Sequence, residues 1–413
     1  VSVALACMVG RRIEVSLDGR IPGQARCESW SRFQGVWINT DWKCRHAESV
    51  NLTKVMPVDQ AVGFLQRRSD LIDPESASLV LMTSGTTSQA KGVTLSHQNL
   101  LGNAAAKLAC VPQSTDDVRL TSLPLSHAYA RTCDLGTWLL SGSTLAIGLG
   151  WEAWTSLAPA VRPTLANVVP SLADRLMECA DDGIPGEKLR LLGCGGAALS
   201  AKAFARWQRR GVIVIQGYGL TEASPVIASA TPANASPGLV GTPVQEWETK
   251  IVDGVLYARG PHTMLGYWND PDATARVVDS EGWLCTGDNV EWDEATGQLR
   301  LLGRADEVVV FSNGRKLHPS TLERALAGIT GVRHAMVDAD SKRRNPIVWL
   351  DTDPDVSLGG ARPRIEELLQ VHVPWLTSIP EIRRFDPSLS FESGELTAKG
   401  TPRRNVIRQR RMT

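Results

Sequence analysis

The sequence predicts an α/β protein with a mainly parallel sheet, followed by a smaller β unit and a mixed α/β segment. From about Ser78, short apolar runs alternate with helical stretches, which is the pattern of βαβ units. After Pro232 the strands are joined by turns rich in Gly, Asp and Asn, and beyond Gly303 strands and helices mix. A chain of 413 residues exceeds one compact core, so we expect a large domain over residues 1–303 and a small one over 304–413.

Individual elements follow from local patterns. Apolar runs predict strands at residues 79–82, 164–169, 189–192 and 212–215, and helices at 96–109 and 171–180. Later strands are expected at 248–257 and 298–302 and near Val308, Val332 and Ile347, with helices near Thr321 and Ile365. The uncharged run 136–150 is shorter than the roughly 20 apolar residues of a membrane span, so it predicts a buried helix end and strand.

Composition narrows the class of protein. Hydrophobic residues make up 43% and charged residues 21%, which is an ordinary globular balance. The 44 Lys and Arg residues equal the 44 Asp and Glu residues, which argues against a nucleic-acid partner. The eight cysteines are scattered without a CxxC pair, and the first residues show no basic segment of a signal peptide. These features predict a cytoplasmic protein without an integral membrane segment.

A loop of small and hydroxylated residues is the strongest local motif. Residues 83–92 (TSGTTSQAKG) follow an apolar strand directly and combine five hydroxyls with Lys91. Small residues let backbone N–H groups approach an anion, so the loop suits the β- and γ-phosphates of a nucleotide. It is not a Walker A loop, because the GK[ST] ending is missing. The alternative is a solvated turn between the strand and a helix capped by Ser96.

Three further motifs follow in an order that favours a nucleotide site. Residues 216–222 (QGYGLTE) place glycines around an aromatic ring, and then offer a hydroxyl to a phosphate and the hard oxygens of Glu222 to Mg²⁺. In residues 283–288 (WLCTGD), Asp288 sits on a turn where its carboxylate could accept both hydroxyls of a ribose. Residues 303–306 (GRAD) add a guanidinium and a carboxylate at the expected domain boundary. Each motif alone could be a turn, a cap or a surface ion pair.

Together these motifs resemble those of the adenylate-forming superfamily, which includes acyl-CoA synthetases, adenylation domains of peptide synthetases and luciferases. The resemblance covers roughly residues 73–407 and extends to 254–260 (GVLYARG), 266–268 (GYW) and 313–319 (NGRKLHP). Residues 123–131 (LPLSHAYAR) and 217–226 (GYGLTEASPV) are most similar to the long-chain fatty acyl-CoA synthetase branch. The resemblance implies that a fatty carboxylate attacks the α-phosphate of ATP to give an acyl-adenylate. A thiol of CoA, or the phosphopantetheine of an acyl carrier protein, then displaces AMP.

The resemblance also assigns roles to residues of this chain. The β- and γ-phosphates would be held by Thr83, Ser84, Gly85, Thr86, Thr87 and Lys91. The adenine would be lined by Gly196, Ala197, Gly217 and Tyr218. Thr221 would contact the α-phosphate, Glu222 would hold Mg²⁺, and Asp288 would bind the ribose with help from Arg304. His127 would lie between the acyl pocket and the nucleotide, and Asp306 would be the hinge about which the C-terminal domain rotates.

The chain departs from the superfamily pattern at three places. The phosphate loop has Ser88 where glycine is usual and Ala90 where proline is usual. The lysine expected near the C-terminus corresponds either to Lys399, two residues early in residues 394–404 (GELTAKGTPRR), or to no lysine, since Thr401 takes its place without a gap. Fewer residues than usual precede the loop, so we expect a shortened front end.

These departures leave three functions open. The first is a ligase that makes acyl-CoA from a medium- or long-chain fatty acid, ATP and CoA. The second is a fatty acyl-AMP or acyl-carrier-protein ligase, and the third is a nucleotide-binding relative with weakened catalysis. The intact Thr221, Glu222, Asp288 and Arg304 favour an enzyme.

Overall fold

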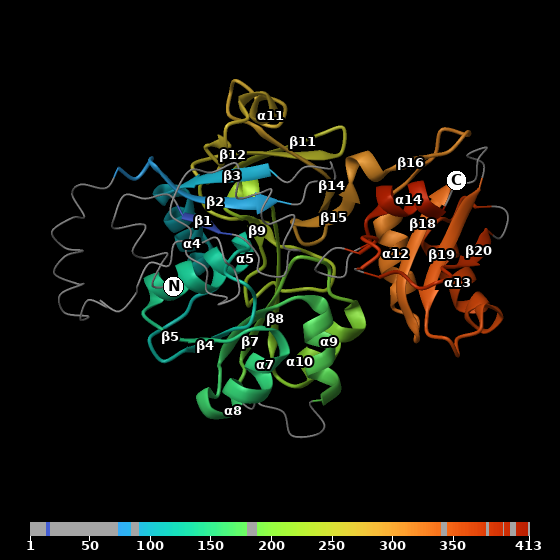
Figure 1. Cartoon of the computed structure of the whole chain (residues 1–413), viewed down its shortest axis with the longest axis horizontal. Coiled ribbons are helices and arrows are strands. Elements are labelled where there is room, and N and C mark those ends of the chain that lie inside the picture. The colour runs from blue at the N-terminus through green and yellow to red at the C-terminus, as the bar shows by residue number, and fades with distance from the viewer. Residues whose placement is uncertain are drawn as a thin grey trace, which may run out of the picture.

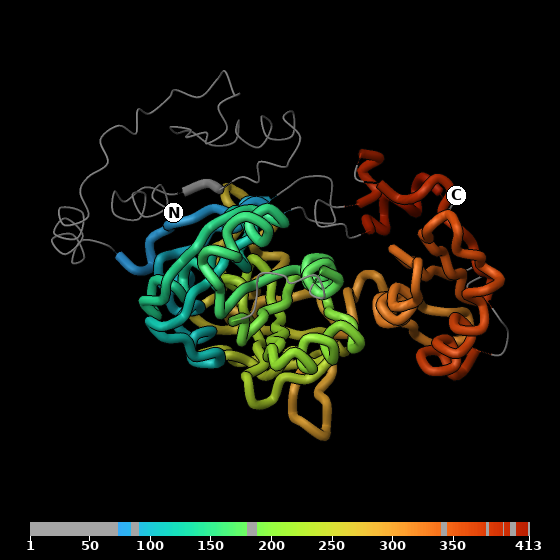
Figure 2. The backbone as a smooth tube through the Cα atoms, turned by 90° about the horizontal axis from the view of Figure 1, so that it is seen from below, coloured from blue at the N-terminus to red at the C-terminus, as the bar shows by residue number. Residues whose placement is uncertain are grey.

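The computed structural model describes residues 73–83, 91–179, 188–339, 345–376, 380–390, 392–396 and 402–411, together with the backbone of a short strand, β1 (Glu14–Ser16). The described chain up to about residue 304 forms a large mass, and the segments after it form a smaller mass beside it (Figures 1 and 2).

A seven-stranded sheet lies at the centre of the large part. Its order is β10-β9-β8-β7-β6-β4-β5, and the strands from β8 to β5 are parallel. The strands are β4 (Val118–Thr121), β5 (Thr144–Ile147), β6 (Leu165–Val168), β7 (Leu191–Cys194), β8 (Ile213–Gly219), β9 (Val226–Ser229) and β10 (Thr242–Pro243). Helices α9 (Pro170–Glu178) and α10 (Ala201–Arg209) pack on it through buried Leu176, Leu192 and Phe204. The expected parallel α/β arrangement is confirmed.

A second sheet carries the ends of the residue 83–92 loop. Strands β2 (Ala77–Thr83) and β3 (Lys91–Ser96) pair antiparallel, β1 pairs with β2, and β13 (Gly266–Tyr267) pairs with β3. Helix α4 (His97–Cys110) then begins at Ser96, whose side chain accepts from the Asn99 N–H while Asn99 accepts from the Ser96 N–H. The loop therefore joins two strands of a hairpin, and not a strand to a helix as the alternative interpretation had it.

The smaller β unit is a four-stranded antiparallel sheet. It consists of β11 (Glu248–Val252), β12 (Val255–Arg259), β14 (Leu284–Asp293) and β15 (Gln298–Arg304). The single strand expected at 248–257 is wrong, because the chain reverses at Asp253 (φ 51°) and Gly254 (φ 82°). Positive φ at both central residues is what a two-residue hairpin turn requires.

The uncharged run 136–150 forms the end of a helical stretch and an edge strand. A π-helical segment (Arg131–Gly136) continues into α6 (Thr137–Ser141), and β5 follows. The expected burial is wrong, because β5 is the outermost strand of its sheet and Leu140 and Leu149 are 45% and 58% exposed. In the part of the chain that the structure describes, no helix combines the length and the apolar character needed to cross a bilayer.

The chain after Arg304 has a hydrophobic cluster of its own. Buried side chains of Leu322, Val337, Leu350 and Ile365 form its centre, and Val309 is its first member along the chain. The elements are β16 (Val309–Val310), β17 (Lys316–Leu317), α12 (Pro319–Ala327), β18 (Val332–Ala339), β19 (Pro346–Thr352), α13 (Leu358–His372), β20 (Glu381–Arg384) and α14 (Arg404–Arg411). A domain boundary at residues 303–304 stays a prediction.

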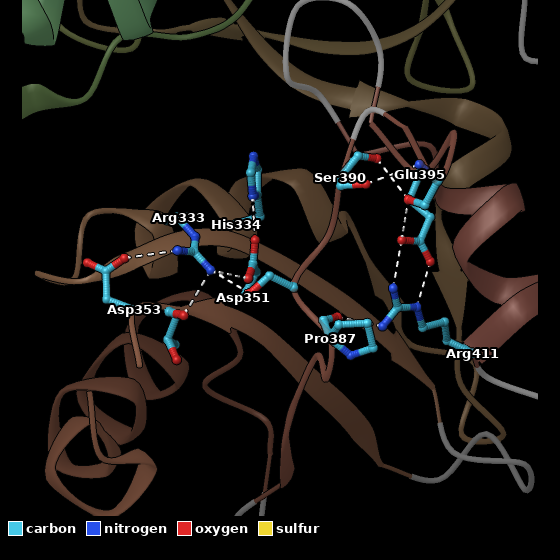
Figure 3. A network of polar contacts seen from close by, with 11 residues as sticks. Arg333, His334, Asp351, Asp353, Pro387, Ser390, Glu395 and Arg411 are labelled. Atoms are coloured by element: carbon cyan, nitrogen blue, oxygen red, sulfur yellow. Dashed lines mark hydrogen bonds and ion pairs between the residues drawn. The ribbon is translucent and has the colours of Figure 1, made fainter. Parts of the chain in front are cut away.

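Ion pairs hold the edge of this smaller part together (Figure 3). The Arg333 guanidinium donates to Asp351 at 2.8 Å and to Asp353 at 3.1 Å, and Glu395 accepts from Arg411 at 2.5 and 2.7 Å. Two other arginines of α14 pair in the same way, Arg404 with Glu323 and Arg408 with Asp338. Three of the four arginines of α14 thus face carboxylates of their own fold, and Arg410 donates to the Ser393 carbonyl.

Short helices complete the large part. They are α5 (Ala128–Ala130), α7 (Gly150–Glu152), a π-helical segment (Ala153–Leu157), α8 (Ala158–Val161) and α11 (Pro271–Ala275).

We predict that Asn103→Ala will destabilise the large part. Asn103 of α4 is fully buried, donates to the Val226 carbonyl at 2.8 Å and accepts from the Val226 N–H at 2.9 Å. The variant removes the acceptor of the buried Val226 N–H and leaves the Val226 carbonyl with the Trp247 indole N–H at 2.8 Å, so we expect the free energy of unfolding to fall by about 1–3 kcal/mol. Urea denaturation measures this, with Gln98→Ala on the exposed face of α4 as the control. Equal unfolding midpoints for the two variants would contradict the prediction.

Candidate active site

Three predicted site residues meet where the parallel sheet and the small β unit come together. The Tyr218 hydroxyl of β8 donates to Asp288 of β14 at 2.6 Å. Arg304, from the end of β15, approaches the other oxygen of Asp288 at 3.5 Å and donates to the Thr286 carbonyl at 3.0 Å. We refer to Tyr218, Asp288 and Arg304 as the Asp288 cluster. Segments far apart in the sequence thus converge on one carboxylate.

The environment of Asp288 opposes its ionisation, while its partners favour it. Burial raises the pKa of the Asp288 carboxyl above its ordinary value, and the hydrogen bond from Tyr218 and the charge of Arg304 reduce that rise. Burial and the neighbouring carboxylate raise the pKa of Tyr218 well above its usual range, so Tyr218 remains a donor. The arrangement presents a partly desolvated carboxylate, an acceptor suited to hydroxyls of a ligand.

Gly287 precedes this carboxylate at a point where space is short. Gly287 has φ 69°, and a Cβ there would lie 2.8 Å from a terminal nitrogen of Arg304. Gly217 and Gly219 of β8 are exposed, whereas Tyr218 between them is only 8% exposed. The aromatic face expected beside exposed backbone is therefore largely covered, and Tyr218 contributes mainly its hydroxyl.

A second group of predicted residues meets around the turn after β8. Thr221 and Glu222 lie in a 3-10 turn (Thr221–Ala223), and both are half-buried. One oxygen of Glu222 accepts from the Tyr267 hydroxyl at 2.8 Å, and the Lys91 ammonium lies 4.7 Å from the centre of the Tyr267 ring. We refer to Glu222, Tyr267 and Lys91 as the Glu222 cluster. Arg304 also lowers the pKa of Tyr267, against the larger effect of burial, so the two clusters lie within electrostatic reach.

The β2–β3 hairpin brings the two ends of the predicted phosphate loop together. Thr83 and Lys91 are direct partners across the hairpin, and the Thr83 hydroxyl donates to the Lys91 carbonyl at 3.4 Å. The rest of the loop, with Ser84, Gly85, Thr86 and Thr87 and the unusual Ser88 and Ala90, lies outside the described residues. Lys91, where the described chain resumes, belongs to the Glu222 cluster.

His127 and the glycines after β7 occupy a third region. His127 is half-buried and precedes α5, and Tyr129 two residues later lies against the β7 end. A Cβ on Gly195 would lie 2.9 Å from the Tyr129 ring. Gly196, with φ 81°, and Ala197 follow and are exposed. The backbone expected to line an adenine is thus open, with the His127 segment packed behind it.

The residues near the expected hinge and catalytic lysine are less tightly held. Asp306 lies in a 3-10 turn (Ala305–Glu307), is 55% exposed and accepts from Arg304 at 3.4 Å. Lys399 lies outside the described residues. The ends of its segment are held together, since Leu396 bridges to Pro402 and the Arg403 N–H donates to the Glu395 carbonyl at 2.7 Å.

The Glu222 cluster offers a cation one carboxylate. Within the described residues, no three His, Cys, Asp or Glu side chains gather at metal-binding distance. Mg²⁺ keeps most of its waters and is commonly held by one or two carboxylates together with substrate phosphates. The exposed glycine backbone, the Lys91 ammonium and the Glu222 carboxylate therefore fit a metal–nucleotide complex better than a bare ion.

Two residues that contact these sites, Thr286 and Tyr267, carry no role in the sequence analysis. Thr286 donates its hydroxyl to the Leu256 carbonyl at 2.8 Å and accepts from the Asp288 N–H at 3.1 Å, which fixes the Asp288 turn. Tyr267 joins Glu222 to Lys91. The motifs 283–288 and 266–268 point to their segments, but only the folded chain pairs them with their partners.

Comparisons with known proteins identify the family of this chain. A model of the family described as AMP-binding enzyme matches residues 28–268. A feruloyl-CoA synthase of Amycolatopsis is 30% identical over 64% of this chain and 56% of its own length. A long-chain-fatty-acid–CoA ligase of Yersinia pestis is 32% identical over 63% of this chain and 49% of its own. The chain thus spans about half the length of the curated relatives it matches.

A solved structure has a similar fold. The o-succinylbenzoate CoA synthetase of Bacillus subtilis, in complex with its acyl-adenylate intermediate, superposes with a TM-score of 0.80 over 98% of this chain and 84% of that one. At 21% identity this likeness concerns the fold, and it confirms the expected α/β class. Because the family match spans more than half of the sequence, the resemblance seen in the motifs is confirmed, and the chain belongs to the family of AMP-binding enzymes.

Proposed function

We propose that this protein activates a carboxylic acid with ATP, forming an acyl-adenylate and pyrophosphate, and then transfers the acyl group to a thiol. The observation that carries the proposal is the Asp288 cluster, because a buried carboxylate held by Tyr218 and Arg304 is an acceptor for the hydroxyls of a ribose. The family match supports the same reading. The comparison structure holds an acyl-adenylate, in its own site.

The proposed chemistry needs positioning more than a protein nucleophile. The carboxylate of the acid attacks the α-phosphorus of ATP, and the bond to pyrophosphate breaks. Two anions must meet, so the site supplies cations and fixed donors. Lys91 and residues 83–87 are proposed for the β- and γ-phosphates, Thr221 for the α-phosphate and Glu222 for Mg²⁺. Lys399 is proposed for the charge that develops during adenylation.

The second step joins the acyl group to a thiol. The thiol loses its proton to solvent and its sulfur attacks the acyl carbon of the adenylate. The bond from this carbon to the phosphate oxygen breaks, and AMP leaves with the electron pair. His127 is proposed to lie between the acid and the nucleotide, and Asp306 to be the hinge between the two steps.

The proposed acid is a medium- or long-chain fatty acid. Residues 123–131 and 217–226 support this choice, and one relative is named as a long-chain-fatty-acid–CoA ligase. Another is named for feruloyl-CoA, so an aromatic acid belongs in the test. CoA is the proposed acceptor, and the phosphopantetheine of an acyl carrier protein is the alternative.

Exchange of labelled pyrophosphate into ATP tests the adenylation step. We expect exchange that depends on Mg²⁺ and on one class in a panel of fatty acids of increasing chain length, with ferulate as the aromatic member. No exchange with any acid, in protein that binds ATP, would favour a nucleotide-binding relative. Product formation with CoA against holo-carrier protein then identifies the acceptor.

Glu222→Gln tests the proposed metal site. The substitution keeps the shape of the side chain and the acceptor for Tyr267 but removes the charge, so we expect exchange to fall by about 10²-fold or more with the melting temperature unchanged. Glu294→Gln, at an exposed position of the small β unit, is the matched control. Wild-type exchange in the Glu222 variant would remove the metal assignment.

Tyr218→Phe tests the proposed ribose site through its pH dependence. The Tyr218 hydroxyl lowers the pKa of Asp288, so its removal raises that pKa further. Less Asp288 is then ionised at a given acidic pH, and the acid limb of ATP binding should move to higher pH. Calorimetric titrations with ATP across a pH series measure the pH below which the affinity falls. If the affinity of the variant falls at the same pH as that of the wild type, or at a lower pH, the assignment is contradicted.

A further inference from the structure

Tyr267 lies between two groups that come from different parts of the fold. Its hydroxyl donates to Glu222 at 2.8 Å, on the turn after β8. Its ring lies 4.7 Å from the Lys91 ammonium, at the start of β3 and the end of the proposed phosphate loop. One side chain therefore joins the proposed metal carboxylate to the proposed phosphate lysine.

The backbone around Tyr267 is fixed to the hairpin. Strand β13 pairs with β3, and its flanks add two hydrogen bonds, from Leu265 N–H to the Thr94 carbonyl at 2.9 Å and from Trp268 N–H to the Gly92 carbonyl at 2.7 Å. The Tyr267 N–H itself donates to the Thr274 hydroxyl at 2.9 Å. These bonds fix the backbone position of Tyr267 relative to Lys91.

The same segment is fixed to the turn that carries Glu222. The Met264 N–H donates to the Glu222 carbonyl at 2.8 Å, and the Ser224 hydroxyl donates to the His262 carbonyl at 2.8 Å. Segment 262–268 consequently holds the turn by its backbone and holds the Glu222 side chain by the Tyr267 hydroxyl.

Each contact has a chemical consequence for its partner. A hydrogen bond from the hydroxyl to one carboxylate oxygen fixes the rotation of the Glu222 carboxylate and leaves its other oxygen for a metal. Carboxylates that bind metals are commonly oriented by such hydrogen bonds. A ring face beneath an ammonium attracts it without neutralising its charge. Burial, and then the Glu222 carboxylate, raise the pKa of Tyr267, which keeps the hydroxyl a donor.

We propose that Tyr267 is a positioning residue, which sets the Glu222 carboxylate and the Lys91 ammonium at a fixed separation to receive the metal-bound polyphosphate of a nucleotide. This inference rests on the proposed function, since it assumes that Glu222 and Lys91 face such a ligand. The two parts of the side chain have separate tasks. The hydroxyl orients Glu222 for the metal, and the ring positions Lys91 for the phosphates.

Two variants separate these tasks. Tyr267→Phe keeps the ring and removes the hydroxyl, and Tyr267→Leu removes both. ATP affinity is measured by calorimetry on the full chain, once with excess Mg²⁺ and once with EDTA, alongside the melting temperature. Tyr257→Phe is the matched control, because Tyr257 of β12 is also half-buried, bonds through its hydroxyl to Cys285 and has Lys250 at 5.8 Å from its ring.

The expected results differ between the two variants. Tyr267→Phe should weaken binding of Mg²⁺-bound ATP by about 10-fold or more while binding of metal-free ATP is unchanged. Tyr267→Leu should weaken both, and Tyr257→Phe neither. A Tyr267→Phe variant that keeps the wild-type ratio of the two affinities, or loses both equally, would overturn the inference. The inference would also be overturned if the wild-type protein bound ATP equally well with Mg²⁺ and with EDTA.

The proposed function fails in a different experiment. Wild-type protein that binds ATP more tightly with Mg²⁺ but exchanges no pyrophosphate with any acid contradicts adenylation. The role of Tyr267 is still decided by the two affinities, because they are binding constants that involve no turnover.

Discussion

A carboxylate that is largely removed from water must be paired, and the structure meets this demand at Asp288 by bringing two sheets together. The hydroxyl that Asp288 accepts comes from β8 of the parallel sheet, and the cation comes from β15 of the small β unit. An unpaired charge at this depth would cost several kcal/mol, on the order found for buried ions. The pairing therefore constrains how the two sheets meet, and the exposed glycine backbone of β8 is placed beside the carboxylate as a result.

The second sheet is joined to the same point through a different set of contacts. Segment 262–268 forms backbone hydrogen bonds to β3 on one side and to the Glu222 turn on the other. Asn99 of α4 adds side-chain bonds to the Pro261 and Thr263 carbonyls at 2.6 and 3.1 Å. The residues expected to handle phosphate thus rest on several rigid elements, which suits a site that works by positioning charge.

The sequence predicted the fold class and about half of the described strands, because these depend on local patterns. Apolar runs marked β2, β6 and β8, and Ser96 was identified as a helix cap. The sequence analysis did not predict the hairpin at Asp253. The turn depends on the positive φ angles of two residues, and the run of polar and apolar residues does not reveal them. The exposure of β5 was missed as well, because the order of strands in a sheet decides which strand is outermost.

The motifs select residues whose chemistry is unusual on its own segment. Asp288, Glu222 and Arg304 were identified from carboxylates and a guanidinium on glycine-rich turns, and the structure brings Asp288 and Arg304 together. Tyr267 and Thr286 could not be assigned that way. A tyrosine hydroxyl or a threonine hydroxyl gains its role from its partner, and the partner of Tyr267 lies 45 residues away in the sequence.

The strength of the contacts decreases from the Asp288 carboxylate toward the proposed hinge. The bond from Tyr218 is 2.6 Å long and joins a buried ring to a carboxylate with a 15% exposed side chain. The contact from Arg304 to Asp306 is 3.4 Å long, with side chains 41% and 55% exposed. Exposed pairs of this kind contribute about 0–1 kcal/mol, so breaking one costs little. In the proposed rotation at Asp306 the exposed contact to Arg304 breaks, while Tyr218 keeps the Asp288 carboxylate in place, because the Tyr218 contact is more deeply buried and does not involve Arg304.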